Sequence, residues 1–128
     1  MRSGMACALA LLAAFALGGV ASAQCRMHHG DVVVLYSSAD DPDVLVWDSR
    51  FRLRDYRAAS FDEAQALLPH AFLAASGTRA EVESCVTEFV KPSLLNPASD
   101  AVGIVIIAGP RRNERGWVSG TDIRLAHH

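Results

Sequence analysis

Ala101 to Arg124 read AVGIVIIAGPRRNERGWVSGTDIR, and this stretch decides the fold. Residues 101–107 are apolar or glycine throughout, so an extended strand here would bury side chains on both of its faces, which is typical of a central strand. Gly109-Pro110 breaks that strand, residues 111–115 are polar, and Gly116-Trp117-Val118 begins a second strand. Turn residues between two apolar runs predict a β-hairpin, here with a charged tip.

Two shorter apolar segments earlier in the chain predict further strands. Residues 31–36 and 44–47 are continuous and rich in β-branched side chains, which favours buried strands over helices. The acidic segment 37–43 between them contains Pro42 and side chains that can bond nearby backbone N–H groups, as turns do. We therefore expect these two strands to pair with each other as an antiparallel hairpin.

The segment 48–57 reads DSRFRLRDYR and alternates between two sets of side chains. In an extended chain the arginine side chains would line one face, and Phe51 and Leu53 would lie on the other. This alternation predicts a half-exposed strand with a row of guanidinium groups on its outer face.

One short helix is expected next. Ser60 and Glu63 have the spacing of a capping box, in which the serine hydroxyl accepts from the backbone N–H of the glutamate and the carboxylate reaches back. The helix is predicted over residues 61–68, because a proline follows. Residues 71–74 and 80–90 predict two more strands, separated by a glycine-containing turn.

The C-terminal hairpin resembles the closing hairpin of bacterial SH3-like barrels, in which a turn rich in glycine and arginine leads into Gly-Trp-Val and then Ser/Thr-x-Asp-Ile/Leu-Arg. The residues that carry this resemblance are Gly116, Trp117, Val118, Asp122, Ile123 and Arg124. Residues 68–85 also resemble the middle region of that family, with His70-Ala71 in place of a Gly-Thr or Gly-Asp pair. The resemblance implies a small all-β SH3-like barrel of five to seven strands with one short helix, in which Trp117 is mainly a core residue.

Residues 1–23 have the pattern of a signal peptide. Arg2 supplies a positive charge, residues 6–20 are apolar, and Ala21-Ser22-Ala23 fits the small-x-small cleavage pattern. The apolar run is shorter than the ~20 residues that a membrane-spanning helix requires. We therefore expect a periplasmic or secreted protein whose mature chain, residues 24–128, is one small β-barrel domain with no membrane span.

The charge of the mature chain excludes some classes of partner. Without Arg2, 11 of the 12 lysine and arginine residues remain against 14 aspartate and glutamate residues, which gives a net charge of −3. Acidic and basic residues are interspersed along the chain, and no basic cluster stands out. Neither nucleic acid nor a membrane surface is therefore expected as a partner.

Two cysteines, Cys25 and Cys85, remain once Cys7 leaves with the signal peptide. An even pair in an exported chain is most simply a disulfide, which would tie the N-terminal segment to the middle of the domain. Metal ligation by the two thiolates is the alternative.

The segment around Cys25 holds donor groups that copper favours. Cys25, Met27 and His29 would converge on one side of an extended chain, and His127 and His128 could add imidazole ligands. A disulfide would remove the strongest donor, so we expect no metal site and no cofactor. Copper binding through a reduced Cys25 is kept as a further hypothesis.

Catalytic motifs are absent from the sequence. It holds no Gly-x-Ser-x-Gly or His-Glu-x-x-His motif and no glycine-rich phosphate loop. Ser49, Asp48 and His70 supply the residue types of a hydrolytic triad, but His70 lies between a proline and apolar residues, where a structural histidine is expected. We therefore expect a protein that is not an enzyme.

Surface recognition remains as a role. Trp47 is expected to be an exposed aromatic side chain. Together with Tyr36, Tyr56 and the arginines Arg50, Arg52, Arg54 and Arg57 it could form a groove of stacking and bidentate groups for an acidic peptide or a glycan carboxylate. Trp117 completes this set of candidate binding residues. The alternative is that the arginines only solubilise an exposed strand.

These expectations favour an exported, non-catalytic binding module of the bacterial cell envelope that recognises a cell-wall peptide or glycan, or an envelope protein. The alternative is a periplasmic inhibitor of a cell-wall hydrolase such as lysozyme. Cys25, Gly30 and the strand that follows resemble the start of the bacterial lysozyme inhibitors. Their internal Ser-Gly-x-Arg-Tyr loop is not matched, because Ala80 follows Ser76-Gly77-Thr78-Arg79.

Overall fold

The computed structural model describes residues 25–92, 94 and 97–126. The expected signal peptide at residues 1–23 and the histidines at 127–128 lie outside the described residues. Within the described chain, no helix is long and apolar enough to span a membrane. Export through a signal peptide therefore stays a prediction.

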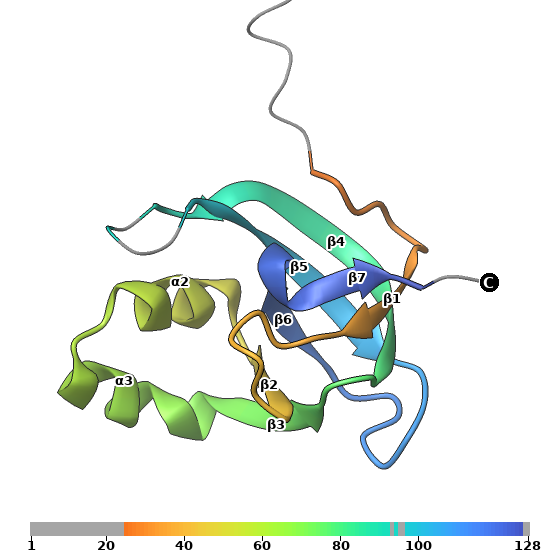
Figure 1. The fold of residues 1–128 in the computed structure, drawn as a ribbon, viewed down its shortest axis with the longest axis horizontal. Coiled ribbons are helices and arrows are strands. Elements are labelled where there is room, and N and C mark those ends of the chain that lie inside the picture. Colours follow the sequence, from red (N-terminus) through yellow and green to blue (C-terminus); the bar gives the residue numbers. More distant parts are fainter. Residues whose placement is uncertain (1–24, 93, 95–96, 127–128) are drawn as a thin grey trace, which may run out of the picture.

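In these described residues, seven antiparallel strands form one curled sheet, and two short α-helices lie beside it (Figure 1). The strands are β1 (Val32–Leu35), β2 (Asp43–Trp47), β3 (Ala71–Ala75), β4 (Arg79–Val90), β5 (Ser99–Ile106), β6 (Arg115–Ser119) and β7 (Ile123–Leu125). The helices are α2 (Arg50–Ala58) and α3 (Phe61–Leu67), with short 3₁₀ helices η1 (Leu68–His70) and η2 (Gly120–Asp122). The strand order is β3-β2-β6-β5-β4-β1-β7, and the sheet bends into a half-barrel. The expected small, barrel-like all-β fold is confirmed, with two α-helices instead of one between residues 25 and 126 as described.

β5 is the central strand that the long apolar run predicted, and β5 and β6 form the expected hairpin. Val102, Ile104 and Ile106 alternate along β5 and are fully buried in the larger part of the core. At the charged tip, the Asn113 N–H donates a hydrogen bond of 2.8 Å to the carbonyl oxygen of Ile106. The central strand and its hairpin are therefore confirmed.

The expected hairpin between β1 and β2 is wrong. β1 pairs with β4 and β7, whereas β2 pairs with β3 and β6. The chain turns away after β1, because the Ser37 hydroxyl accepts hydrogen bonds from the backbone N–H groups of Ala39 and Asp41. The Tyr36 N–H donates to the carbonyl oxygen of Asp122, which holds this turn beside η2. The partners of both strands are thus set by distant segments and not by the loop between them.

The segment that was expected to be a half-exposed strand forms α2 instead. Ser49 caps this helix, because its hydroxyl accepts a hydrogen bond from the Phe51 N–H at 3.1 Å. The helix directs Leu53, which is 1% exposed, against the sheet, and Tyr56 packs beside it one turn later. Alternating polarity is compatible with either structure over so short a segment. Burial of Leu53 and the serine cap favour the helix.

α3 confirms the predicted short helix. The Ser60 hydroxyl accepts a hydrogen bond of 3.4 Å from the Glu63 N–H, as the capping-box spacing predicts. The helix ends at Leu67, and η1, which contains Pro69, follows directly. The two strands expected after this helix are present as β3 and β4.

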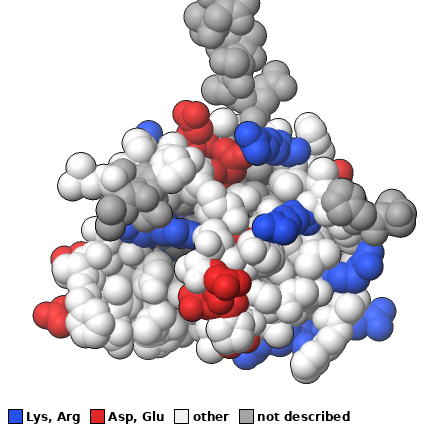
Figure 2. All heavy atoms as spheres, in the orientation of Figure 1, with Lys and Arg blue, Asp and Glu red and all other residues white. Residues whose placement is uncertain are grey.

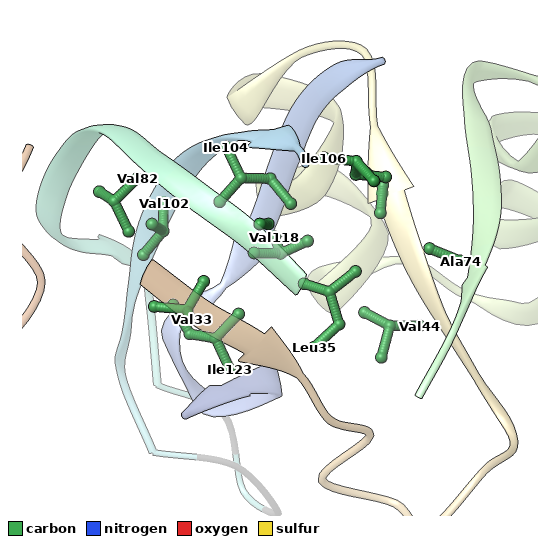
Figure 3. Packing of buried hydrophobic residues seen from close by; sticks show 12 residues of the cluster. Val33, Leu35, Val44, Ala74, Val82, Val102, Ile104, Ile106, Val118 and Ile123 are labelled. Atoms are coloured by element: carbon green, nitrogen blue, oxygen red, sulfur yellow. The ribbon is translucent and has the colours of Figure 1, made fainter. Parts of the chain in front are cut away.

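The core has two parts, one on each side of the sheet. The larger part lies inside the curl, where Val33 of β1 and Ile123 of β7 lie side by side (Figure 3). The smaller part lies between α2 and the outer face of the sheet, and it consists of Trp47, Leu53, Val90 and Ala101. Both faces of β5 are therefore covered, which explains why its apolar run is continuous.

The expected disulfide between Cys25 and Cys85 is present, and it joins Cα atoms 6.3 Å apart. It ties the segment before β1 to the middle of β4. The two cysteines are separated by 60 residues in the sequence. In the chain-entropy model a loop of this length raises the free energy of unfolding by about 4 kcal/mol.

Candidate functional site

Two arginines of α2 lie among three aromatic rings on the outer side of the sheet. We call this cluster the arginine–aromatic face, and its members are Arg50, Phe51 and Arg54 of α2, Phe89 of β4 and Trp117 of β6. Arg50 and Arg54 are four residues apart and therefore share one side of the helix. The rings of Phe51 and Phe89 pack edge to face, with centroids 5.4 Å apart. The helix and the sheet thus each supply part of this surface.

Gly103 makes room for the indole ring of Trp117. The two residues are register partners on β5 and β6. A Cβ atom on residue 103 would lie 3.3 Å from Cη2 of Trp117 and 2.7 Å from Oγ of Ser84. Because glycine has no Cβ, the indole can lie close to the backbone of β5, with the Arg50 guanidinium over its ring.

A bulge in β4 precedes Phe89. The register between β4 and β5 shifts between Val86 and Val90, and Glu88 adopts a φ of 49° in the left-handed region. That conformation is unfavourable for a residue with a side chain. The Glu88 N–H donates a hydrogen bond of 2.9 Å to the carboxylate of Asp100, which helps to hold the bulge. Asp100 therefore contributes to the position of Phe89.

The guanidinium group of Arg50 is bordered by aromatic rings. Its central carbon lies 5.1 Å from the ring centroid of Phe51 and 5.6 Å from those of Phe89 and Trp117. The Nε atom is buried and has no hydrogen-bond partner among the described residues. Cation–π contacts stabilise the positive charge, but they leave the hydrogen-bonding requirement of Nε unmet.

Arg54 adds a second guanidinium group to the same surface. Its central carbon lies 5.3 Å from the ring centroid of Phe51 and 5.4 Å from that of Phe89. Its Nε atom pairs with a carboxylate oxygen of the neighbouring Asp55 at 3.2 Å, and both side chains are about half exposed to solvent. Such pairs contribute little to stability. Since Phe51 is also 48% exposed, the surface presents an apolar ring beside two cationic groups.

Elsewhere on the molecule, charges of both signs are mixed. Figure 2 shows basic and acidic side chains interspersed over the face in view. Arg115 pairs with Glu83 at 3.3 Å and Arg111 pairs with Glu114 at 3.2 Å. In the part of the chain that the structure describes, Arg50 has no such carboxylate partner.

The expectation that Trp47 is exposed is wrong, because this side chain is 1% exposed. β2 is paired on both sides, and α2 covers the end of the strand where Trp47 lies. The indole packs against the ring of Tyr56, with centroids 4.8 Å apart. The contact between Trp47 and Tyr56 therefore packs α2 against the end of β2, and Trp47 offers no stacking surface to a ligand.

The other expected binding residues separate into two places. Arg50 and Trp117 are in contact within the arginine–aromatic face. Trp117 is half-buried and packs against the smaller part of the core, which agrees with the core role that the SH3-like resemblance implied. Arg52 instead binds Asp48, with Nη1 3.0 Å from both carboxylate oxygens. The structure thus places Arg52 outside the cluster that contains Arg50.

Two of the three residue types of a hydrolytic triad do come together. The Nδ1 atom of His70 lies 3.3 Å from the carboxylate of Asp48. The Ser49 hydroxyl, however, accepts a hydrogen bond from the first turn of α2 and serves as the helix cap. The contact between Asp48 and His70 therefore joins the start of α2 to η1, which is a structural arrangement.

The donors of the copper hypothesis do not converge on one point. Cys25 is bonded to Cys85, Met27 packs against the larger part of the core, and His29 is exposed. The histidines at 127–128 lie outside the described residues. Copper binding through a reduced Cys25 stays a hypothesis.

Phe51 and Phe89 are the members of the arginine–aromatic face that sequence analysis missed. The signal for Phe51 is helical: once the segment is taken as a helix, the spacing of Arg50 and Arg54 brings them to one side with Phe51 next to them. Phe89 has no local signal, because its place depends on the bulge in β4.

Comparison with known proteins gives no relative from which a function could be transferred. The chain matches no family model, no curated protein and no solved structure. The resemblance of the C-terminal hairpin to bacterial SH3-like barrels stays a prediction. The function must therefore be argued from the arginine–aromatic face itself.

Proposed function

We propose that this protein is an exported, non-catalytic binding module of the bacterial cell envelope and that it holds a carboxylate-bearing ligand on the arginine–aromatic face. The ligand class is a cell-wall component, namely an acidic stem peptide or a glycan with carboxylate groups. The observation that carries the proposal is the state of Arg50, whose buried Nε atom has no hydrogen-bond partner among the described residues.

A buried guanidinium N–H without a hydrogen bond is costly, because water has been removed from it without a replacement. A guanidinium group binds a carboxylate through two parallel hydrogen bonds, which are charge-assisted and directional. A ligand carboxylate would pair with the Nη groups of Arg50, and it would also supply the acceptor that Nε lacks once the bordering rings move aside. Arg54 lies over the same two phenylalanine rings and could hold a second acidic group of the same ligand.

The aromatic members of the face would supply contact area. Phe51 is 48% exposed and would be covered by the apolar part of a peptide or by the flat side of a sugar ring. Aromatic and arginine side chains together are the residue types that dominate binding energy at protein surfaces. The combination favours a ligand that is anionic and partly apolar.

Two further observations support a place in the cell envelope. Residues 1–23 have the composition of a signal peptide, and the Cys25–Cys85 disulfide is the kind of bond that persists in oxidising compartments. The SH3-like resemblance of the C-terminal hairpin points the same way, since domains of that family often bind cell-wall peptides or protein partners.

The test is retention of the oxidised mature chain, residues 24–128, on purified peptidoglycan. We expect the Arg50→Ala and Arg54→Ala variants each to lose about tenfold or more in affinity. The matched control is Arg52→Ala, which removes the same charge from the same helix but leaves the arginine–aromatic face intact. Equal retention of all four proteins would overturn the proposed site.

A second arm separates wall binding from inhibition of a wall enzyme. The oxidised protein is added to a lysozyme assay with peptidoglycan as the substrate. Inhibition by a protein that does not itself bind the polymer would replace the proposed function with that of a hydrolase inhibitor. Retention on the polymer without inhibition of the enzyme would support the binding module.

A further inference from the structure

A carboxylate lies beside the disulfide. The sulfur atoms of Cys25 and Cys85 and a carboxylate oxygen of Asp100 all lie within 4.8 Å of one another, and all three residues are half-buried. Two sulfur ligands and one carboxylate oxygen form a donor set that Zn²⁺ uses in proteins. As long as the disulfide is intact, the two sulfur atoms are bonded to each other and are not available as thiolate ligands.

The backbone fixes the two donors that lie on the sheet. Cys85 of β4 is the register partner of Val102 on β5, and Asp100 lies two residues before Val102 on that strand. One oxygen of Asp100 accepts the hydrogen bond of 2.9 Å from the Glu88 N–H, which orients the carboxylate. A ligating carboxylate that is held by a second hydrogen bond is typical of metal sites. Asp100 is thus oriented whether or not the sulfur atoms are bonded to each other.

A cavity lies next to Asp100. It has a volume of about 400 Å³, and its lining includes Arg26 and Met27 next to Cys25 together with Glu88 and Asp100. The cavity is large enough for several water molecules. A metal ion bound beside the cavity would keep one water molecule as its fourth ligand, as three-ligand zinc sites do.

We propose that reduction of the Cys25–Cys85 disulfide creates a zinc site formed by Cys25, Cys85 and Asp100. A dithiol supplies two electrons and two protons, the S–S bond breaks, and the dithiol becomes a cyclic disulfide. When Zn²⁺ binds, both cysteine thiols release their protons to solvent, because the thiolate is the ligand. The metal ion then joins Cys25 to Cys85 and closes the same loop that the disulfide closed.

Zinc is the ion of choice for this set of donors. Thiolates exclude the hard ions Ca²⁺ and Mg²⁺, which take oxygen ligands. Zn²⁺ accepts sulfur and carboxylate oxygen together and prefers a tetrahedral arrangement. This inference rests on the disulfide and its neighbours, and not on the arginine–aromatic face.

The test compares oxidised and reduced mature protein. The protein is reduced with a dithiol under nitrogen, the dithiol is removed by gel filtration, and Zn²⁺ is added. We expect one equivalent of bound zinc in the reduced protein and none in the oxidised protein. Equal binding by the two forms would overturn the proposal.

Two substitutions identify the carboxylate ligand. Asp100→Asn keeps an oxygen that can accept from Glu88 but is a much poorer zinc ligand, so the reduced variant should bind zinc about tenfold or more weakly. Glu88→Gln removes an acid from the same cavity and serves as the matched control, with unchanged affinity. Unchanged affinity in Asp100→Asn would mean that the thiols bind zinc without Asp100, and it would overturn the site.

A structural readout covers the case in which the reduced protein unfolds. The melting temperature of the reduced protein is measured with and without Zn²⁺ by circular dichroism. The metal should restore folding or raise the melting temperature in the wild type, and less so in Asp100→Asn, because it replaces the lost cross-link. No effect of Zn²⁺ on the reduced wild type would count against the proposal.

Discussion

Arg57 and Asp122 form an ion pair with an Nη2 to Oδ2 distance of 3.1 Å, although 65 residues separate them in the sequence. Both side chains are mostly buried, with 27% and 17% of their surface exposed. The other oxygen of Asp122 accepts hydrogen bonds from the backbone N–H and the hydroxyl of Ser38, at 3.0 and 2.8 Å. One carboxylate thus joins the end of α2, η2 and the loop after β1.

Asp122→Ala should lower the free energy of unfolding by about 2 kcal/mol, because it leaves the Arg57 guanidinium and the Ser38 N–H without their acceptor. The measurement is urea-induced unfolding followed by tryptophan fluorescence. Asp55→Ala is the control, since it removes an exposed partner of Arg54 and should change the free energy by less than about 1 kcal/mol. Equal effects of both substitutions would contradict the role that we give to Asp122.

Ser49→Ala should lower the free energy of unfolding by about 1 kcal/mol, because the Phe51 N–H at the start of α2 loses its acceptor. Ser49→Asp should retain the stability of the wild type, since an aspartate side chain caps helices equally well. Thermal unfolding of the three proteins under one set of conditions gives the comparison. If the alanine variant has the same melting temperature as the wild type, the stability of α2 does not depend on this cap.

Gly116→Ala should destabilise the sheet by about 2 kcal/mol. An added Cβ would collide with Cγ1 of Val46 and would lie 2.7 Å from the carbonyl oxygen of Trp47, and β2 is too firmly paired to move away. Gly120→Ala is the matched control, because its Cβ would come no closer than 3.4 Å to Asp100. The midpoint of urea unfolding should be lower for Gly116→Ala than for Gly120→Ala. Similar midpoints would show that β2 moves to accommodate the added Cβ atom.

Sequence patterns predicted β1 to β6, because each of these strands is either continuously apolar or alternating, and both patterns follow from burial on the faces of a sheet. No pattern predicted the three-residue strand β7. The disulfide was predictable because only two cysteines follow the expected signal peptide. α2 was not predicted, because Arg50 to Tyr56 offer only one fully buried side chain, Leu53. With so few apolar positions, a period of two and a period of 3.6 residues cannot be distinguished.

The binding surface was predictable only in part. Arg50 and Trp117 were expected, and the structure brings them into contact across α2 and β6. Trp47 was expected to be exposed because it stands beside the charged residues Asp48 and Arg50, but the helix that covers it was not foreseen. Phe89 depends on the bulge in β4 and on the carboxylate of Asp100 in the neighbouring strand, and no local pattern reports such a contact.

The position of β1 has a consequence for how the chain folds. β1 lies between β4 and β7, and its Val33 is the register partner of Leu125, near the opposite end of the described chain. Pairing between segments so far apart in sequence is slow, because a long loop must close before the contact forms. A chain that emerges from its N-terminus onward cannot complete this sheet until residues 123–125 are available. The edge of the sheet beside β1 therefore stays unpaired until nearly all of the described chain is present.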